Sequence, residues 1–188
     1  MKSIKKIVTA VISTALVLLV CGCSKTITVT NDPQLEQSLY GTWNIAVESQ
    51  IEVWSDPDTE FAKYLGTATV LTTNQMIFSP DQNFQIINSA TLSSVKIHDD
   101  AFVSEEDLKL QMEKAISIQG KFSVDKDYLE LKSETVKVNN TTSYTAEEYT
   151  KIDSSFGSAD QIQKWALSGN NLTISDLSAK STVVFTKQ

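Results

Sequence analysis

Arginine is absent from this chain of 188 residues, and every one of its sixteen basic residues is a lysine. Without guanidinium groups, the chain lacks the planar fork of donors that binds carboxylates and phosphates most firmly. Cysteine is also scarce, because Cys21 and Cys23 are the only two and both lie near the N-terminus. No cysteines remain to cross-link the body of the chain, so we exclude a fold held together by disulfides.

The shortage of basic and nucleophilic residues also excludes several functions. Acidic residues outnumber lysines by 23 to 16, which disfavours nucleic acid as a partner because phosphate contacts need clustered positive charge. The chain has one histidine, His98, and no Gly-x-Ser-x-Gly sequence, so nucleophilic catalysis has no support. A pair of catalytic carboxylates far apart in sequence stays open, but no such pair is indicated. We expect a protein that is not an enzyme and needs no cofactor.

The N-terminal segment has the pattern of a secretory signal. Three lysines precede an uncharged, largely apolar run from Ile7 to Val20. A membrane-spanning helix needs about 20 apolar residues, so this run is too short to be a comfortable span. We therefore expect the segment to direct export.

The end of that run, Val20-Cys21-Gly22-Cys23, resembles the cleavage site of bacterial lipoprotein signals. That pattern is an aliphatic residue, a small residue, Gly or Ala, and an invariant cysteine; Cys21 is an unusual choice at the second place. The resemblance implies cleavage before Cys23 and a diacylglyceryl group on its sulfur, which would anchor the protein to a membrane. An ordinary signal peptide with incidental cysteines is the alternative.

The resemblance also divides the chain and implies a location. Residues 1–22 are then a lipoprotein signal peptide, 23–38 a lipid-anchored tether, and 39–188 a single domain. Removal of residues 1–22 takes away three lysines and leaves a processed chain with a net charge of −10. Ser24 follows the cysteine in place of an acidic residue, which by resemblance to proteobacterial lipoproteins favours the outer membrane. We expect the periplasmic face of that membrane first and the cell surface second.

Residues 42–53 show the clearest strand pattern. The apolar residues occupy odd positions, and the even positions between them are mostly polar; the apolar set is Trp43, Ile45, Val47, Ile51 and Val53. Strict alternation predicts one face in a core and one in water, as in an antiparallel sheet. A strand of this length favours a barrel or a strongly coiled sheet.

Further short strands follow, joined by turn sequences at 80–82, 125–127 and 169–171. The predicted strands cover residues 68–71, 75–79, 83–88, 121–124, 128–132, 135–138, 162–167, 172–175 and 181–186. With the first strand, these patterns predict a mainly β domain, an antiparallel up-and-down barrel of about eight to ten strands.

One or two short helices accompany the strands. Ser104 and Asp107 form a capping box, and an apolar face then continues to Gly120 through Leu108, Met112, Ala115 and Ile116. Thr145 and Glu148 form a second capping box, which predicts a short helix near residues 147–154.

The stretch Leu39-Tyr40-Gly41-Thr42-Trp43 resembles the start of the first strand of lipocalins, and "KWALSGNNLTIS" and "TVVFTKQ" resemble their closing strands. The resemblance implies that Gly41 and Trp43 form a structural plug at one end of a lipocalin-like barrel. Two departures stand out: the chain lacks the mid-chain Thr-Asp-Tyr sequence and the arginine that packs on the tryptophan. Lys187 or Lys164 is the candidate to replace that arginine.

Candidate ligand contacts are aromatic. Trp54, Phe61 and Tyr64 are close enough in sequence to form a patch at the barrel mouth; the alternative is that they pack beneath the loop 54–66. His98 beside two aspartates is weak evidence for a metal, because zinc sites usually draw several His or Cys ligands.

An acidic series is also insufficient for a metal. Asp56, Asp58 and Glu60 alternate like the opening of a calcium loop, but Phe61 and Thr67 stand where that loop needs Gly and Glu. We expect no metal site.

These patterns leave two functions open. The first is a membrane-anchored envelope lipoprotein that binds a small apolar or amphipathic ligand in its barrel. The second is a non-enzymatic scaffold or inhibitor with a packed barrel, which binds a protein or glycan through an exposed patch around Trp54 and Tyr64.

Overall fold

The computed structural model describes residues 27–54, 63–98, 104–153, 158–177 and 181–188. Its strands are β1 (Gly41–Trp54), β2 (Tyr64–Ser79), β3 (Asn83–Ile97), β4 (Lys114–Val124), β5 (Tyr128–Val138), β6 (Thr142–Thr145), β7 (Asp160–Ser168), β8 (Asn171–Ser175) and β9 (Thr182–Lys187). Its helices are α2 (Pro33–Leu39), α3 (Glu105–Met112) and α4 (Ala146–Ile152). The prediction of a mainly β protein is confirmed.

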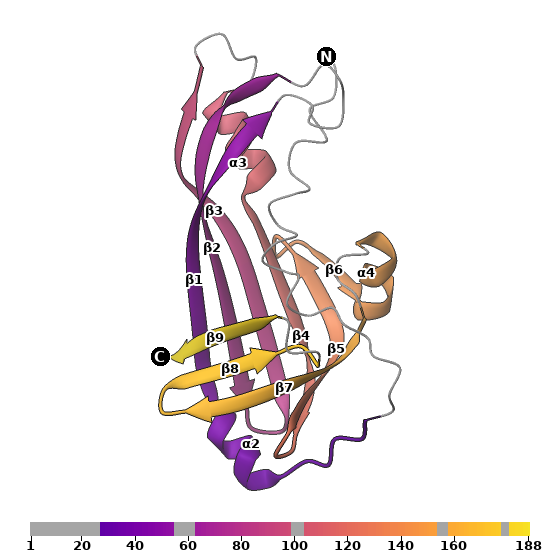
Figure 1. The fold of residues 1–188 in the computed structure, drawn as a ribbon. Helices are drawn as coiled ribbons and strands as arrows, with labels where there is room; N and C mark the ends of the chain where they lie inside the picture. Colours follow the sequence, from indigo (N-terminus) through magenta and orange to yellow (C-terminus); the bar gives the residue numbers. More distant parts are fainter. Residues whose placement is uncertain (1–26, 55–62, 99–103, 154–157, 178–180) are drawn as a thin grey trace.

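Eight of these strands close into an antiparallel barrel (Figure 1). Each pairs with its neighbours in the order β1-β2-β3-β4-β5-β7-β8-β9, and β9 returns to β1. The ninth strand, β6, lies outside the ring, because it pairs with the later half of β5 while β7 pairs with the earlier half. The three predicted turns join β2 to β3, β4 to β5, and β7 to β8.

The first three strands are much longer than the last two. They contain 14, 16 and 15 residues, whereas β8 and β9 contain five and six. β4 accompanies β3 only as far as Ala90, and β9 accompanies β1 only at Trp43 and Asn44. Past the barrel, β1 from Glu48, β2 up to Leu71 and β3 from Thr91 continue as a three-stranded sheet, which we call the extension (Figure 1).

The barrel and the extension have separate hydrophobic cores. The barrel core includes the fully buried Trp43, Phe78 and Phe122, with the Phe78 and Phe122 rings in edge contact at 4.9 Å between centroids. The extension packs one face on α3, through Leu108 and Met112. A lone three-stranded sheet would leave this face in water, so α3 is what makes the extension stable.

The prediction of a helix continuing to Gly120 is wrong. α3 ends at Met112, and Ala115, Ile116 and Gly120 belong to β4. The capping box at Ser104 and Asp107 is present as predicted. The helix ends because β4 pairs with both β3 and β5, and this double pairing outweighs a local helical pattern. The second capping box is also present, and it opens α4.

The helix α2 covers one end of the barrel, within the segment expected to be a tether. The backbone N–H of Asp32 donates to the carbonyl of Val124 at 2.8 Å, and its side chain accepts from the N–H of Gln34 at 2.9 Å. The described part of this segment is therefore attached to the barrel from Asp32 onward.

A buried carboxylate holds α2 in place. The hydroxyl of Tyr40 donates to Glu36, as do the side-chain amides of Asn31, at 2.6 Å, and Gln82, at 3.5 Å. The hydrogen bond from Tyr40 and then that from Asn31 lower the pKa of Glu36, and the same bond to Glu36 raises the pKa of Tyr40 to about 12. Glu36 thus joins α2 to the turn between β2 and β3.

Replacing Glu36 with Gln should lower the free energy of unfolding at pH 7. It should also make that free energy less sensitive to acid. The folded-state pKa lies below the ordinary value of 4.5, so the carboxylate stabilises the fold above that pH and the contribution disappears as pH falls through the folded pKa. At pH 7 we expect Glu36→Gln to lower the free energy of unfolding by about 1–3 kcal/mol. Its urea midpoint should then fall less than the wild-type midpoint between pH 6 and pH 3.

Glu105→Gln is the matched control. Glu105 is exposed on α3 and pairs with Lys109 at 3.0 Å, so its loss should cost no more than about 0.5 kcal/mol. Equal acid dependence in wild type and Glu36→Gln would contradict the role given to Glu36.

Candidate functional site

Trp43 closes the lower end of the barrel. Its indole N–H donates to the carbonyl of Leu39 at 2.7 Å, and its ring is fully buried. The ammonium of Lys187 lies 5.0 Å from the ring centroid. Gly41 has φ +126°, and a Cβ there would lie 3.0 Å from the Lys187 side chain. Of the two lysines considered for the missing arginine, Lys187 is therefore the one at Trp43.

Above this packed end, one layer of the barrel interior contains two amides. Ile45, Asn74, Asn88 and Ile116 are register neighbours on the consecutive strands β1 to β4. Asn74 lies on the same face of β2 as the buried residues Met76 and Phe78, so the Asn74 side chain points to the inside of the barrel. Asn88 is likewise inside, with 9% of its surface exposed.

The side-chain oxygen of Asn74 is buried and has no hydrogen-bond partner among the described residues. A buried acceptor without a donor lowers the stability of a fold by about 1–3 kcal/mol, so the unpaired Asn74 oxygen destabilises the unliganded protein. By contrast, Asn44 on the other face of β1 accepts from the Gln75 side chain at 3.0 Å. A ligand that brings an N–H or O–H into the barrel would satisfy Asn74.

The barrel wall is open next to this layer. Val47 lies on the same strand face as Trp43, yet 52% of its surface is exposed. The expectation that Val47 lies in a core is therefore wrong. The reason is that β9 stops after Asn44, so no strand covers β1 at Val47. We call Ile45, Val47, Asn74, Asn88 and Ile116 the inner face. Val47 is exposed at its edge, whereas Asn88 and Ile116 are buried.

Sequence reasoning missed both amides. Asn74 lies in the polar stretch "TTNQ" and Asn88 in "INSA", and neither residue belongs to a recognisable site motif. The available signal was their alternation, because Asn74 keeps the parity of Phe78, and Asn88 keeps that of Phe84. An asparagine in register with buried residues is a buried polar group.

The aromatic residues expected at the barrel mouth lie elsewhere, at the tip of the extension. The rings of Trp54 and Tyr64 meet edge to face at 5.4 Å between centroids, and Tyr64 meets His98 in the same way at 5.6 Å. Tyr64 is 37% exposed, and the Trp54 indole donates to Glu52 at 3.2 Å. Phe61, the third aromatic candidate, lies outside the described residues. We call Trp54, Tyr64 and His98 the tip cluster.

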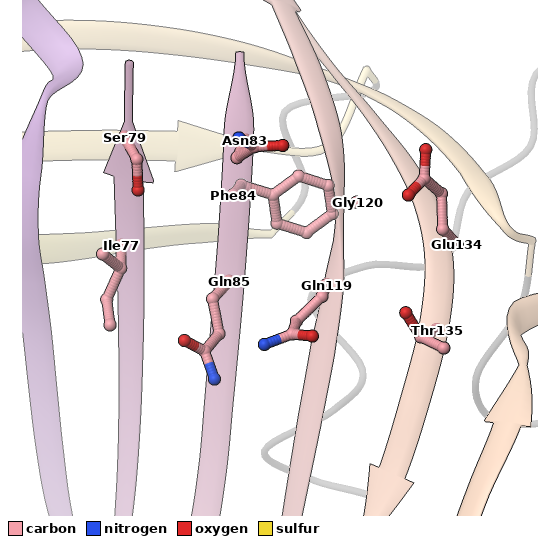
Figure 2. Close-up of a pocket in the computed structure, with 9 residues that line it drawn as sticks. All are labelled: Ile77, Ser79, Asn83, Phe84, Gln85, Gln119, Gly120, Glu134 and Thr135. Atoms are coloured by element: carbon pink, nitrogen blue, oxygen red, sulfur yellow. The ribbon is translucent and has the colours of Figure 1, made fainter. Parts of the chain in front are cut away.

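A shallow hollow of about 320 Å³ lies on the outer wall, across β2 to β5 (Figure 2). Gly120 is part of its lining, and a Cβ there would meet the Lys132 carbonyl at 2.0 Å. The hollow is lined by Ile77, Ser79, Asn83, Phe84, Gln85, Gln119, Gly120, Glu134 and Thr135. Its lining contains a single titratable side chain, Glu134, so we assign no chemistry to it.

The described ranges contain no candidate metal site and no candidate membrane-spanning helix. No group of three or more His, Cys, Asp and Glu side chains within those ranges could hold a metal ion. No helix among the same residues is long and apolar enough to cross a membrane. Cys23 and the acidic series from Asp56 to Glu60 lie outside the described part of the chain.

The chain matches no protein-family model and no curated protein. Its class is therefore given by the structure: a closed antiparallel barrel of eight strands with short helices, the architecture of a lipocalin-like barrel. The inner face with Asn74 distinguishes this barrel from one that is filled only by its own apolar side chains.

Proposed function

We propose that this protein is a bacterial envelope lipoprotein that binds a small amphipathic ligand on the inner face of its barrel. The observation that carries the proposal is the buried, unpaired oxygen of Asn74 beside an open wall. A ligand donor would satisfy that oxygen, and the ligand's apolar part would cover the exposed Val47. Neither step needs a catalytic group or a cofactor.

The chemistry of the inner face limits the ligand class. Asn74 offers an acceptor, and Ile45 and Val47 offer aliphatic surface. The processed chain has a net charge of −10 and no arginine, which disfavours anions. A neutral or cationic amphiphile with one N–H or O–H donor fits these properties best.

The membrane anchor is the second part of the proposal. Residues 1–22 direct export, and a lipid on Cys23 holds the protein at the outer membrane, first at its periplasmic face. The support is the signal pattern that ends in Val20-Cys21-Gly22-Cys23. Acyl chains gain about 0.8 kcal/mol per buried CH₂, so more than one chain gives a stable anchor without a spanning helix.

The tip cluster supports a second candidate, a protein- or glycan-interaction module. Tyr64 and His98 are exposed at the end of the extension, and the Trp54 ring meets Tyr64 edge to face. Adjacent tyrosine and tryptophan side chains are common anchors of binding surfaces. In this function the barrel serves as a stalk that presents the tip.

Ligand binding predicts opposite effects of one substitution on stability and on affinity. Asn74→Leu removes a buried acceptor without a donor, so the unliganded fold should unfold at the same or a higher urea concentration. Its affinity for N-phenyl-1-naphthylamine, a neutral fluorescent amphiphile with one N–H, should fall about tenfold, the effect of losing one hydrogen bond. Both measurements use protein produced without its signal segment. A urea titration gives the stability, and a fluorescence titration with the dye gives the affinity.

Asn44→Leu is the matched control for Asn74→Leu. It removes an asparagine that already accepts a hydrogen bond on the outer face, so it should lower stability and leave dye affinity unchanged. An unaltered affinity in Asn74→Leu, or no dye uptake by the wild type, would refute binding on the inner face.

The anchor predicts a change in cell fractionation. Cys23→Ala should move the protein from the membrane to the soluble fraction, because no sulfur remains for the lipid. Cys21→Ala is the control and should stay with the membrane. Continued membrane association of Cys23→Ala would disprove the proposed anchor.

The interaction module predicts specific capture through the tip. The wild-type protein should recover a partner from its own envelope that Trp54→Ala recovers at least about tenfold less, since a central aromatic contact is worth 2 kcal/mol or more. An unrelated lipoprotein is the background control. Recovery of the same proteins by wild type, Trp54→Ala and the control would exclude this candidate.

A further inference from the structure

Beyond Asn44, one edge of β1 has no strand beside it among the described residues. The carbonyl of Thr42 accepts from the N–H of Gln188 at 3.0 Å, so the even-numbered residues of β1 direct their backbone groups away from β2. β9 uses this edge only at the lower end, at Trp43 and Asn44. From Ala46 to Glu52, the even-numbered residues therefore present N–H and C=O groups that pair with no described strand. Residues 46–50 are also exposed on both faces.

The opposite edge of the extension is protected. On β3, the N–H of Leu92 donates to the Glu113 side chain at 3.4 Å, just after α3. α3 itself packs on β3 through the core of the extension. Unprotected edges are templates for pairing with another chain, so the free edge of β1 is the one that can pair with a further strand.

We infer that two copies of the chain pair antiparallel along this edge, with Ser49 opposite Ser49 of the second copy. In that register Glu48 faces Gln50 of the second copy, and Glu52 faces Ala46. Each of these pairs exchanges two backbone hydrogen bonds, since their free groups point outward. On the other face, Val47 packs against Ile51 of the second copy, which covers the exposed valine.

The charges select this register over its neighbours. A shift that centres the pairing on Gln50 places Glu48 opposite Glu52, and a shift that centres it on Glu48 places two glutamates opposite each other. Like charges directly opposite are destabilising in an antiparallel pair. The register centred on Ser49 avoids both and still uses every free residue from Ala46 to Glu52.

The pairing has two geometric and electrostatic consequences. It joins the two extensions into a continuous sheet and places the two α2 helices at opposite ends of the dimer. Each processed copy has a net charge of −10, so salt should strengthen the association by screening. The pairing lengthens the wall beside the inner face and does not depend on a ligand bound there.

Disulfide trapping in intact cell envelopes tests the register in the full chain. Ser49 lies at a pair without hydrogen bonds, where Cα atoms are about 4.5 Å apart, within the range of a disulfide. Ser49→Cys should therefore give a disulfide-linked dimer of twice the chain mass. Gln50→Cys is the matched control, because residues 50 of the two copies lie on a diagonal beyond the roughly 7 Å limit for a bridge. We expect at least about tenfold less dimer from Gln50→Cys.

The outcomes separate the possible occupants of the edge. More dimer from Gln50→Cys than from Ser49→Cys would overturn the register, and no dimer from either would overturn the pairing. A bridge from residue 49 to a different protein would overturn the second copy as the occupant.

A proline on the free edge tests the same inference without a new thiol. The N–H of Gln50 points away from β2, so Gln50→Pro removes no ladder bond within the subunit but blocks the pairing. Light scattering of the detergent-solubilised, lipidated protein should show a dimer for wild type and a monomer for Gln50→Pro. Circular dichroism and dye affinity should remain unchanged in Gln50→Pro. A wild-type monomer at all salt concentrations, or a dimer that persists in Gln50→Pro, would overturn the inference.

Discussion

The brief contact between β1 and β9 is the constraint on which the rest of the molecule depends. Only Trp43 and Asn44 pair with β9, because β8 and β9 are short while β1 to β3 are long. Closure at one end allows the aromatic side chains there to pack fully, and it leaves the longer strands without neighbours further along. The exposed Val47 and the free edge of β1 both follow from this difference in strand length.

The extension shows how the protein stabilises strands that leave the barrel. One face packs on α3 to form a second core, and Glu113 satisfies a donor on the outer edge of β3. The edge of β1 receives no such protection from any described residue. This asymmetry is what turns β1 into a candidate interface, since backbone groups in an unpaired strand gain hydrogen bonds from any suitable partner.

The layer with Asn74 and Asn88 separates the packed end from the open one. Two amides among aliphatic residues reduce the stability that a purely apolar layer would provide. Such a cost is typical of positions used for recognition, because a buried acceptor can discriminate between ligands with and without a donor. The closed end has the opposite character: there the buried Glu36 is satisfied by three donors and serves to attach α2.

Features that depend on neighbouring residues could be predicted from the sequence. The alternation after Gly41 predicted β1, the turn residues predicted three hairpins, and two capping boxes predicted the starts of α3 and α4. The end of α3 could not be predicted, because Ala115 and Ile116 fit a helical face as well as a strand face. Pairing of β4 with strands on both sides settled that choice, and a local pattern contains no information about it.

The sequence by itself determined the β class, the hairpins and the burial of Trp43, since all of these follow from periodicity and turn chemistry. Only the tertiary structure decided that Val47 is exposed, that Trp54 and Tyr64 sit at the tip with His98, and that Asn74 lacks a donor. The physical reason is that exposure and hydrogen bonding depend on where β9 ends relative to β1. That position is set by contacts between residues more than a hundred apart in the chain.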